Sequence, residues 1–502
     1  MKLVQLLDGI VVRAVHGDLQ IEVGELRDDS RAILLGDVFV AIAGQSVDGH
    51  AFIERAEALG ARAVIVERQV TFSGTQVVVE STGKLLAQLA QNRYGHPDRA
   101  LRLIGVTGTN GKTTTTFLVE AILAAAGRST GVIGTVTYRW AGKDRPAPFT
   151  TPGPIALQQT FAAMLADGVS DVAMECSSHA IEQGRLDGLS FSVAAFTNLT
   201  QDHLDFHGSM TAYRDSKAKL FRERLARDGS AVILVDREEA NFMAAASVGR
   251  VLRVSARNAE DADLAVLHSQ SSLEGTVAEL RTPSGSLALR SPLVGAFNLE
   301  NLVVACGIGF ALGISASTIA AALATANGAP GRLERVRETE ALSVYSFVDY
   351  AHTPDALERV LTVLRPLTAR RLIVVFGCGG DRDRSKRAIM GGIGARLADL
   401  AIITSDNPRT EAPESILVTI LEGASRSGKA AIGKGELLGD CRGYYAEGDR
   451  RTAIDLAVRL AQPGDVIVVA GKGHEDYQIL GKTKHPFDDR QELRRAVATK
   501  AS

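Results

Sequence analysis

The chain has 502 residues of ordinary globular composition, with 45% hydrophobic and 23% charged residues and a formal net charge of -2. Nucleic acid is therefore not expected as its main partner, because neutralising a phosphate backbone requires an excess of basic residues. The four scattered cysteines lack C-x-x-C spacing, which disfavours a zinc site or a disulfide framework and favours a reducing compartment. The N-terminal apolar run is too short and too interrupted by charge for a signal peptide or membrane span, so we expect a cytoplasmic protein.

The length predicts about three domains. The first, residues 1–98, is expected to be a small α/β domain that ends in a turn-rich linker at 94–98. Polar, glycine-rich loops at 28–31 and 44–49 suit hydrogen bonding to a ligand, and they suit ordinary turns equally well. The predicted strands are 38–42, 63–66 and 76–79, and the predicted helices are 51–59 and 84–93.

A phosphate-binding loop is predicted where the apolar run Leu103–Val106 leads through Thr107–Thr113 into a helical segment. Glycines let backbone N–H groups approach phosphates, and the helix N-terminus adds its positive dipole end. Lys112 can reach the terminal phosphates, and the Thr113 hydroxyl can bind Mg²⁺. The loop is a variant, because Val106 stands where G-x-x-x-x-G-K-[ST] has its first glycine. A turn without ligand is the alternative, and we predict that the loop binds a nucleoside triphosphate.

The second domain, residues 99–336, is expected to hold a mostly parallel sheet covered by helices, with strands at 103–106, 170–174, 193–197 and 231–235. Ligands in such sheets collect at the carboxyl ends of the strands. Glu175 and His203 follow two of these ends and are plausible ligands for a phosphate-bridging cation, although a lone buried carboxylate is more often an ion-pair partner. Asn298 and Asn301 open a helix, either as caps or as contacts to a purine base.

The third domain, residues 337–502, is expected to be Rossmann-like α/β. A polar or glycine-rich motif follows each of its four predicted strands, which suggests one rim of a binding site. A G-x-G without the full fingerprint is weak evidence for a dinucleotide, so we favour a substrate-binding domain over an NAD domain. The predicted strands are 343–349, 371–376, 400–404 and 466–469.

Together these motifs resemble the Mur ligase family, over a stretch from Ser30 to about Gln478. The resemblance implies an α/β protein of three domains and an ATP-dependent acid–amino-acid ligase that works through an acyl phosphate with Mg²⁺. The likeness is greatest to the members that add the third amino acid of the peptidoglycan precursor. It implies the substrates UDP-N-acetylmuramoyl-L-alanyl-D-glutamate and meso-2,6-diaminopimelate, and a monomer. The motifs that carry it are 107–113, 175–179, 202–205, Lys217, 298–301, 349–354 and 406–409.

The resemblance also implies roles for individual residues around ATP. Lys112, Glu175, His203 and Lys217 are expected to be catalytic. Lys217 is expected to be carbamylated by CO₂, which turns a cation into an extended carboxylate; Lys219 competes for this role, but residues i and i+2 do not share a helix face. The implied metal ligands are Thr113, Glu175, His203 and carbamylated Lys217. The implied ATP contacts are Gly108, Thr109, Asn110, Gly111, Lys112, Thr113, Thr114, Asn298, Asn301 and Arg332.

The substrate contacts follow from the same resemblance. Arg409 is the most specific of them, because diaminopimelate has a distal carboxylate that lysine lacks, and lysine would leave the guanidinium unpaired. Two alternatives remain: a folylpolyglutamate synthase, and a P-loop NTPase that drives motion or signalling. The implied contacts are Asp28, Ser30, Gln45, Ser46 and Val47 for UDP; Thr150, Thr151, Ser177, Gln183 and Arg185 for the muramoyl dipeptide; and Arg382, Asp406, Asn407, Pro408, Arg409, Gly471 and Glu475 for diaminopimelate.

Overall fold

The computed structural model describes residues 1–44 and 47–501, and it confirms the predicted α/β class. Contacts between Cα atoms divide the chain into two units, which are described separately. Unit 1 comprises residues 1–267, 280–287 and 300–322, and unit 2 comprises 268–279, 288–299 and 323–502. Along the described part of the chain, no helix is long and apolar enough to cross a membrane.

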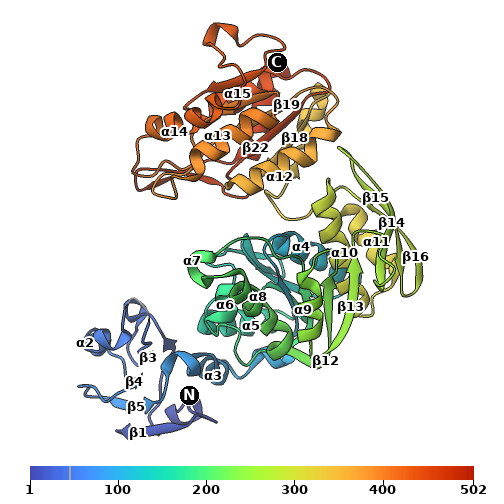
Figure 1. The fold of residues 1–502 in the computed structure, drawn as a ribbon. Helices are drawn as coiled ribbons and strands as arrows, with labels where there is room; N and C mark the ends of the chain where they lie inside the picture. Colours follow the sequence, from blue (N-terminus) through green and yellow to red (C-terminus); the bar gives the residue numbers. More distant parts are fainter. Residues whose placement is uncertain (45–46, 502) are drawn as a thin grey trace. The chain divides into compact units, whose positions relative to one another are not determined.

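The N-terminal part of unit 1 is a five-stranded sheet in the order β1-β5-β4-β3-β2 (Figure 1). Alternate residues of each strand point to opposite faces, and both faces are buried. Val38 and Ile65 pack toward α1 and α3, whereas Phe39 and Val64 pack toward α2. The elements are α1 (Leu3–Leu6), β1 (Val12–His16), β2 (Leu26–Arg27), β3 (Val38–Val40), α2 (Ile53–Ala58), β4 (Ala63–Val66), β5 (Thr75–Val79) and α3 (Thr82–Tyr94).

The central sheet has eleven strands in the order β16-β15-β14-β13-β12-β11-β6-β10-β7-β8-β9. Its core is parallel, as predicted, because β6, β7 and β10–β13 pair in parallel. Its strands are β6 (Arg102–Thr107), β7 (Thr130–Ile133), β8 (Thr137–Trp140), β9 (Lys143–Pro146), β10 (Asp171–Glu175), β11 (Phe191–Phe196), β12 (Leu225–Leu234) and β13 (Arg250–Ser255).

Helices flank this sheet, and they position the polar side chains that follow its strands. The face carrying Leu103, Met174 and Phe196 packs against α5, α8 and α9. The helices are α4 (Lys112–Ala125), α5 (Pro154–Ala166), α6 (Ser178–Glu182), α7 (Leu204–His207), α8 (Met210–Lys219), α9 (Glu239–Ala246), α10 (Ala296–Ala311) and α11 (Ala316–Thr325).

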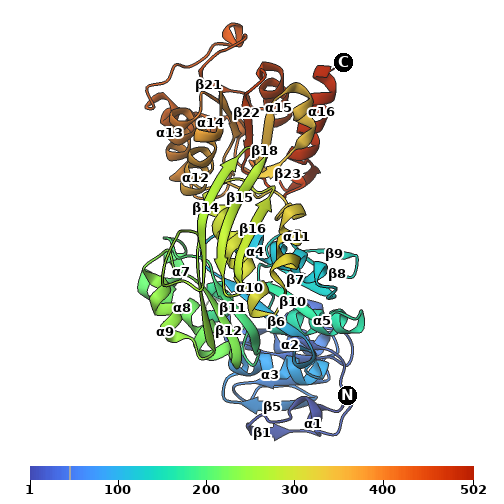
Figure 2. The same cartoon turned by 90° about the vertical axis from the view of Figure 1, so that its right-hand side faces the viewer.

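Three further strands, which the sequence analysis does not predict, extend the central sheet as a meander (Figure 2). They are β14 (Leu264–Ser272), β15 (Gly275–Thr282) and β16 (Gly285–Ser291). Two-residue turns join them, and such short turns permit only antiparallel neighbours. The boundary between the two units crosses all three strands.

The C-terminal sheet has the order β17-β18-β22-β19-β20-β21, and all its pairs are parallel except β17 with β18. One face, with Phe347 and Val374, packs against α12, α13 and α14; the other, with Ile373 and Val469, packs against α15 and α16 (Figure 2). The elements are β17 (Glu334–Arg335), β18 (Tyr345–Asp349), α12 (Pro354–Leu364), β19 (Leu372–Phe376), α13 (Lys386–Leu397), β20 (Leu400–Ile403), α14 (Pro413–Ser425), β21 (Gly443–Ala446), α15 (Arg450–Leu460), β22 (Val466–Ala470), β23 (Tyr477–Leu480), β24 (Thr483–Pro486) and α16 (Asp489–Ala501).

A fully buried ion pair stabilises this sheet. The Arg371 guanidinium donates to Asp465 Oδ2 over 2.6 Å, and both side chains are 0% exposed. Replacing Arg371 by methionine removes the buried partner of Asp465 and leaves only the more distant Arg370, at 3.3 Å, so we expect a destabilisation of about 3–5 kcal/mol. Urea unfolding checks this value. The matched change Arg396→Met breaks an exposed pair with Glu358 and should cost less than about 1 kcal/mol. Equal losses in the two variants would contradict the prediction.

Candidate functional site

The predicted phosphate loop lies between β6 and α4, at the carboxyl edge of the central sheet. Gly108 and Gly111 have φ angles of 148° and 87°, which side chains rarely adopt. A Cβ atom at Gly108 would lie 1.9 Å from Thr197 Oγ1, and one at Gly111 would lie 2.2 Å from Asn301 Oδ1. Both glycines are therefore required by conformation and by close packing.

Neighbouring strand ends hold this loop in place. Thr197 Oγ1 donates to the Asn110 carbonyl over 2.6 Å, and Asn110 N donates to Asn198 Oδ1 over 3.0 Å. Thr109 Oγ1 donates to the Thr200 carbonyl over 3.1 Å. Thr113 and Thr114 are buried in the first turn of α4. The polar motif after β11 thus holds the phosphate loop in place. This structural role is additional to the ligand binding that the position of the motif predicts.

We expect Gly108→Ala to weaken ATP binding by about tenfold or more, because the methyl group would displace the loop from Thr197. Calorimetric titration of ATP measures the effect. Gly127→Ala is the matched control, because Gly127 has a φ of 74° but nothing within 4 Å of its Cβ position. The control carries the strain of a left-handed residue, about 1–2 kcal/mol, but not the clash. Equal ATP affinity in the two variants would show that the clash has no effect.

Two lysines meet at the loop. Lys112 Nζ and Lys217 Nζ each donate to the Gly108 carbonyl over 2.9 Å. Lys217, on α8, is 1% exposed, and its Nζ lies 4.2 Å from the centre of the Tyr213 ring. Burial, together with the positive charge of Lys112, lowers the pKa of Lys217 well below its ordinary value. The buried side chain therefore favours the neutral amine, which is the form that reacts with CO₂.

Lys219, the competing lysine on the same helix, points elsewhere. Its Nζ forms an ion pair with Glu182 at 2.8 Å, and the pair is partly exposed. The two lysines therefore occupy different faces of α8, and Lys217 is the one that reaches the phosphate loop.

Glu175 ends β10 as a buried carboxylate that is 1% exposed. Its two oxygens accept from Thr135, over 2.7 Å from the backbone N–H and 3.1 Å from the hydroxyl. The Thr135 hydroxyl also lies 3.1 Å from that of Thr150, and Thr151 Oγ1 donates to the Glu175 carbonyl over 2.7 Å. The predicted metal ligand and two predicted dipeptide contacts are thus linked by hydrogen bonds.

The other predicted dipeptide contacts belong to the same network. Ser177 N donates to Thr151 Oγ1 over 3.1 Å, and Arg185 Nη1 donates to the Thr151 carbonyl over 2.8 Å. Arg185 also binds Gln183 Oε1 through Nε and Nη2, which orients the guanidinium. The half-buried guanidinium suits a substrate carboxylate, because it can make two parallel hydrogen bonds.

His203 begins α7 with a left-handed φ of 52° and packs edge-on against His179, with ring centres 4.6 Å apart. In the described ranges 1–44 and 47–501, no three His, Cys, Asp or Glu side chains are arranged to hold a metal ion. Mg²⁺ usually keeps several waters and takes substrate phosphate oxygens among its ligands, beside one or two carboxylates. The buried carboxylate of Glu175 and the Lys217 amine fit the implied Mg²⁺ and carbamate in their chemistry.

The predicted uridine contacts Asp28, Ser30 and Val47 line one hollow of about 610 Å³ in the N-terminal part of unit 1. Phe52 and Arg55 line it too, and the sequence analysis does not single them out. An aromatic ring and a guanidinium suit a nucleotide base and phosphates. Gln45 and Ser46, also predicted there, lie outside the described residues.

In unit 2, Asn298 and Arg332 are the predicted ATP contacts. Asn298 lies inside α10 and donates from Nδ2 to the Val294 carbonyl over 3.0 Å, so the alternative of a helix cap is wrong. Arg332 lies over the Tyr350 ring, 4.8 Å from its centre. Asp349 is buried beside it, and burial raises the pKa of Asp349 to about 6.

The predicted amino-acid contacts meet at the carboxyl ends of β19, β20 and β22. Asn407 Nδ2 donates to Glu475 Oε2 over 2.9 Å, and a Cβ atom at Gly471 would lie 3.7 Å from the Asp406 carboxylate. Arg409 Nη1 donates to the Gly380 carbonyl over 2.8 Å. Pro408 is buried, and Arg382 is exposed, with its Cγ 3.8 Å from the Cβ position of Gly379.

The hairpin of β23 and β24 clamps this loop. Arg409 N donates to the Ile479 carbonyl over 3.1 Å, and Gly481 N donates to the Arg409 carbonyl over 2.8 Å. Gln478 Nε2 donates to the Asp406 carbonyl over 2.7 Å. These bonds hold Arg409 at a left-handed φ of 54°, a conformation that costs a side-chain-bearing residue about 1–2 kcal/mol.

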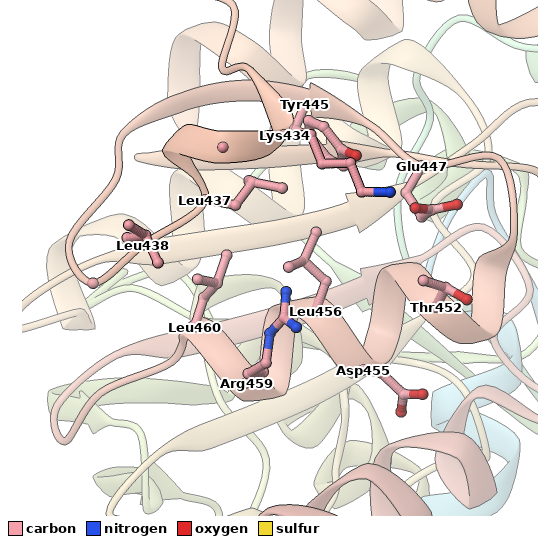
Figure 3. A pocket seen from close by; sticks show the side chains of 12 residues that line it. Lys434, Leu437, Leu438, Tyr445, Glu447, Thr452, Asp455, Leu456, Arg459 and Leu460 are labelled. Carbon is pink, nitrogen blue, oxygen red and sulfur yellow. The ribbon is translucent and has the colours of Figure 1, made fainter.

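Sequence reasoning gave no individual role to several residues of these sites, namely Thr135, Phe52, Arg55 and Lys472. Lys472 is the one that the sequence could have singled out, because it belongs to the polar motif after the last predicted strand, at the edge where ligands collect. Unit 2 contains another hollow, of about 740 Å³, which lies between the segment 434–439, β21 and α15 (Figure 3). No predicted site residue lines it.

Comparison with known proteins assigns three successive parts of the chain. The Mur ligase family, catalytic domain model matches residues 23–94. The Mur ligase middle domain matches 106–309, and the Mur ligase, glutamate ligase domain matches 331–473. Together these matches cover most of the chain and include the phosphate loop, the Glu175 network and the Asp406–Arg409 loop.

Curated relatives match nearly the whole chain. A UDP-N-acetylmuramoyl-L-alanyl-D-glutamate–2,6-diaminopimelate ligase from Geobacter metallireducens is 44% identical, with 95% of this chain and 94% of the relative covered. One from Geobacillus kaustophilus is 43% identical, with 99% of each covered. A solved structure of a ligase of this name has a TM-score of 0.72 at 33% identity, covering 100% of this chain and 99% of its own. The chain therefore belongs to the Mur ligase family, as its motifs predict.

Proposed function

We propose that the protein is an ATP-dependent ligase that adds meso-2,6-diaminopimelate to UDP-N-acetylmuramoyl-L-alanyl-D-glutamate. The observation that carries this proposal is a hydrogen-bonded network within unit 1, in which the backbone carbonyl of Glu175 accepts from Thr151 and the Thr151 carbonyl accepts from Arg185. A residue whose carboxylate can bind a cation is thus linked through Thr151 to a guanidinium that can bind a substrate carboxylate. The relatives that bear this ligase name cover nearly the whole chain.

The chemistry requires activation, because a carboxylate is a poor acylating agent. The γ-carboxylate of D-glutamate attacks the γ-phosphorus of ATP, ADP leaves, and an acyl phosphate forms. The amine of the incoming amino acid then attacks the acyl carbon, inorganic phosphate leaves, and the amine loses a proton. During the transfer of the γ-phosphate, Lys112 offsets the negative charge of the phosphates. Mg²⁺, when bound, offsets the repulsion between carboxylate and triphosphate.

The remaining assignments divide among three substrates. The hollow at Asp28 and Ser30 takes the uridine end, and the network of Thr150, Thr151, Ser177, Gln183 and Arg185 takes the muramoyl dipeptide. The ATP contacts are the loop 108–114 with Asn298, Asn301 and Arg332. The amino acid is held by the rim of Arg382, Asp406, Asn407, Pro408, Arg409, Gly471 and Glu475, in which Arg409 binds the distal carboxylate.

We also propose domain limits of 1–98, 99–336 and 337–502, and a cytoplasmic monomer. The first two family matches fall inside the corresponding limits, and the third begins at 331, close to the limit at 337. Light scattering that gives the mass of one chain would support the monomer.

Phosphate release with a panel of amino acids tests the proposal. The purified protein should release phosphate only when ATP, the UDP-linked dipeptide and diaminopimelate are all present, with ligated product in equal amount. Release without an amino acid would indicate an NTPase of another kind. Release that requires a folate and glutamate would indicate a folylpolyglutamate synthase, and either result would overturn the proposal.

A further inference from the structure

Lys472 is a buried lysine two residues after the end of β22, and its side chain is 0% exposed. Its ammonium donates to the Tyr477 carbonyl over 2.7 Å and to Asn407 Oδ1 over 3.1 Å. It lies 3.5 Å from Asp406 Oδ1 and 3.7 Å from Glu475 Oε2. Burying an ammonium costs several kcal/mol unless charges and hydrogen bonds compensate it. The compensating groups here are the Tyr477 carbonyl and three residues of the proposed amino-acid rim.

These contacts fix the side-chain amide of Asn407. Its Oδ1 accepts from Lys472 and also from Ile479 N over 2.9 Å. With both donors on the oxygen, the amide must present its NH₂ group on the other side. There Nδ2 donates to Glu475 Oε2 over 2.9 Å. The ammonium thus orients the Glu475 carboxylate through Asn407 as well as through its own charge.

The charge of Lys472 also affects the two carboxylates of the rim, Asp406 and Glu475. Burial, and then the negative charge of Asp406, raise the pKa of Glu475. The two carboxylates therefore repel each other when both are ionised. Lys472 offsets part of this repulsion. The nearby buried cation Arg450 cannot do so to the same extent, because it is paired with Asp489 through bonds of 2.8 and 2.7 Å.

The two candidate amino acids differ in charge at their distal end. Diaminopimelate carries an ammonium and a carboxylate there, whereas lysine carries an ammonium alone and is one unit more positive. A fixed cation beside the site opposes the more positive ligand. Lys472, Arg409 and the exposed Arg382 all contribute in this sense, and Lys472 is the fully buried member of the three.

We propose that Lys472 is a positioning residue of the amino-acid site, which holds Asp406, Asn407 and Glu475 in place and favours a zwitterionic distal end over a cationic one. This inference rests on the proposed assignment of the rim to the amino acid. Lys472 acts through its neighbours, whereas the other residues of the rim are proposed to contact the substrate.

Steady-state kinetics of Lys472→Met with diaminopimelate, lysine and ATP test the inference. We expect the KM for diaminopimelate to rise about tenfold or more and the KM for ATP to stay within about twofold. The ratio of kcat/KM for diaminopimelate over lysine should fall about tenfold. Lys472→Arg should recover part of the ratio because it keeps the charge. Lys500→Met is the matched control, since Lys500 also binds backbone carbonyls, those of Val458 and Ala461.

A diaminopimelate KM and a ratio both within about twofold of wild type would overturn the inference, as would equal losses for ATP and diaminopimelate. If Lys472→Met does not fold, the double variant Asp406→Asn/Lys472→Met, which removes one charge of each sign, replaces it. A diaminopimelate KM near the wild-type value in that variant would also overturn the inference. A wild-type protein that does not use diaminopimelate would instead refute the proposed function.

Discussion

Lys217→Ala is expected to lower ligase activity by more than about a hundredfold and to make the remaining activity independent of bicarbonate. The neutral amine that burial favours can add to CO₂, and the product is a carboxylate positioned at the phosphate loop. Losing a residue that only hydrogen-bonds to a metal ligand lowers metal affinity or activity by about 10–100-fold. Losing a ligand itself should therefore lower activity further. Wild-type protein freed of CO₂ should lose activity and regain it when bicarbonate is added.

The controls separate carbamylation from packing. Lys219→Ala lies on the same helix and removes only the partly exposed pair with Glu182, so its activity should stay near that of wild type. Lys217→Arg keeps a cation but cannot carry the carbamate, and it should be as inactive as Lys217→Ala. Full activity of Lys217→Ala, or wild-type activity that does not respond to CO₂, would refute the carbamate.

Arg409→Ala should reduce kcat/KM for diaminopimelate by about 30-fold to several thousandfold, while ATP affinity stays near wild type. The expected cost is the about 2–5 kcal/mol that follows when one partner of a hydrogen-bonded charge pair is removed. Alanine keeps a Cβ atom at the left-handed φ of 54°, so the backbone strain is unchanged and the loss reports the guanidinium. Amino-acid-dependent phosphate release measures it.

Arg396→Ala is the matched control, because it removes an exposed arginine that pairs with Glu358 on the same unit. Its kinetic constants should stay within about twofold of wild type. The ratio of diaminopimelate to lysine use should fall in Arg409→Ala, since only diaminopimelate has the distal carboxylate. Unchanged discrimination between the two amino acids would assign the selection to other residues.

The sequence predicted best what depends on neighbouring residues. Buried parallel strands are continuous apolar runs, and so β6, β4 and β22 were found within one or two residues of their ends. The Gly-Lys-Thr register identified the loop because a strand, glycines and a helix must follow one another directly. In the structure, Tyr213 and Lys217 lie one helical turn apart on α8, and both side chains reach the loop.

The sequence could not predict contacts between distant segments. Thr135 binds Glu175 across 40 positions, and Lys472 binds Asn407 across 65. No local pattern in either segment reports the other. The strands β14, β15 and β16 were also missed, because none of them has the continuous apolar run of a central strand: β14 is buried only over its first three residues, and β15 and β16 alternate between buried and exposed residues. Asn298 was read as a possible helix cap because the helix start at Ala296 carries no capping residue type.

The clamp on the loop 406–409 has a consequence for attempts to change which amino acid the protein accepts. The backbone of the loop depends on β23 for its conformation, and its side chains depend on the segment after β22. A loop with other side chains could keep the backbone bonds to β23, but it would lose the bonds of Asn407 to Lys472 and Glu475. Changing which amino acid the protein accepts should therefore require the loop 406–409, the segment after β22 and the β23–β24 hairpin to be exchanged together.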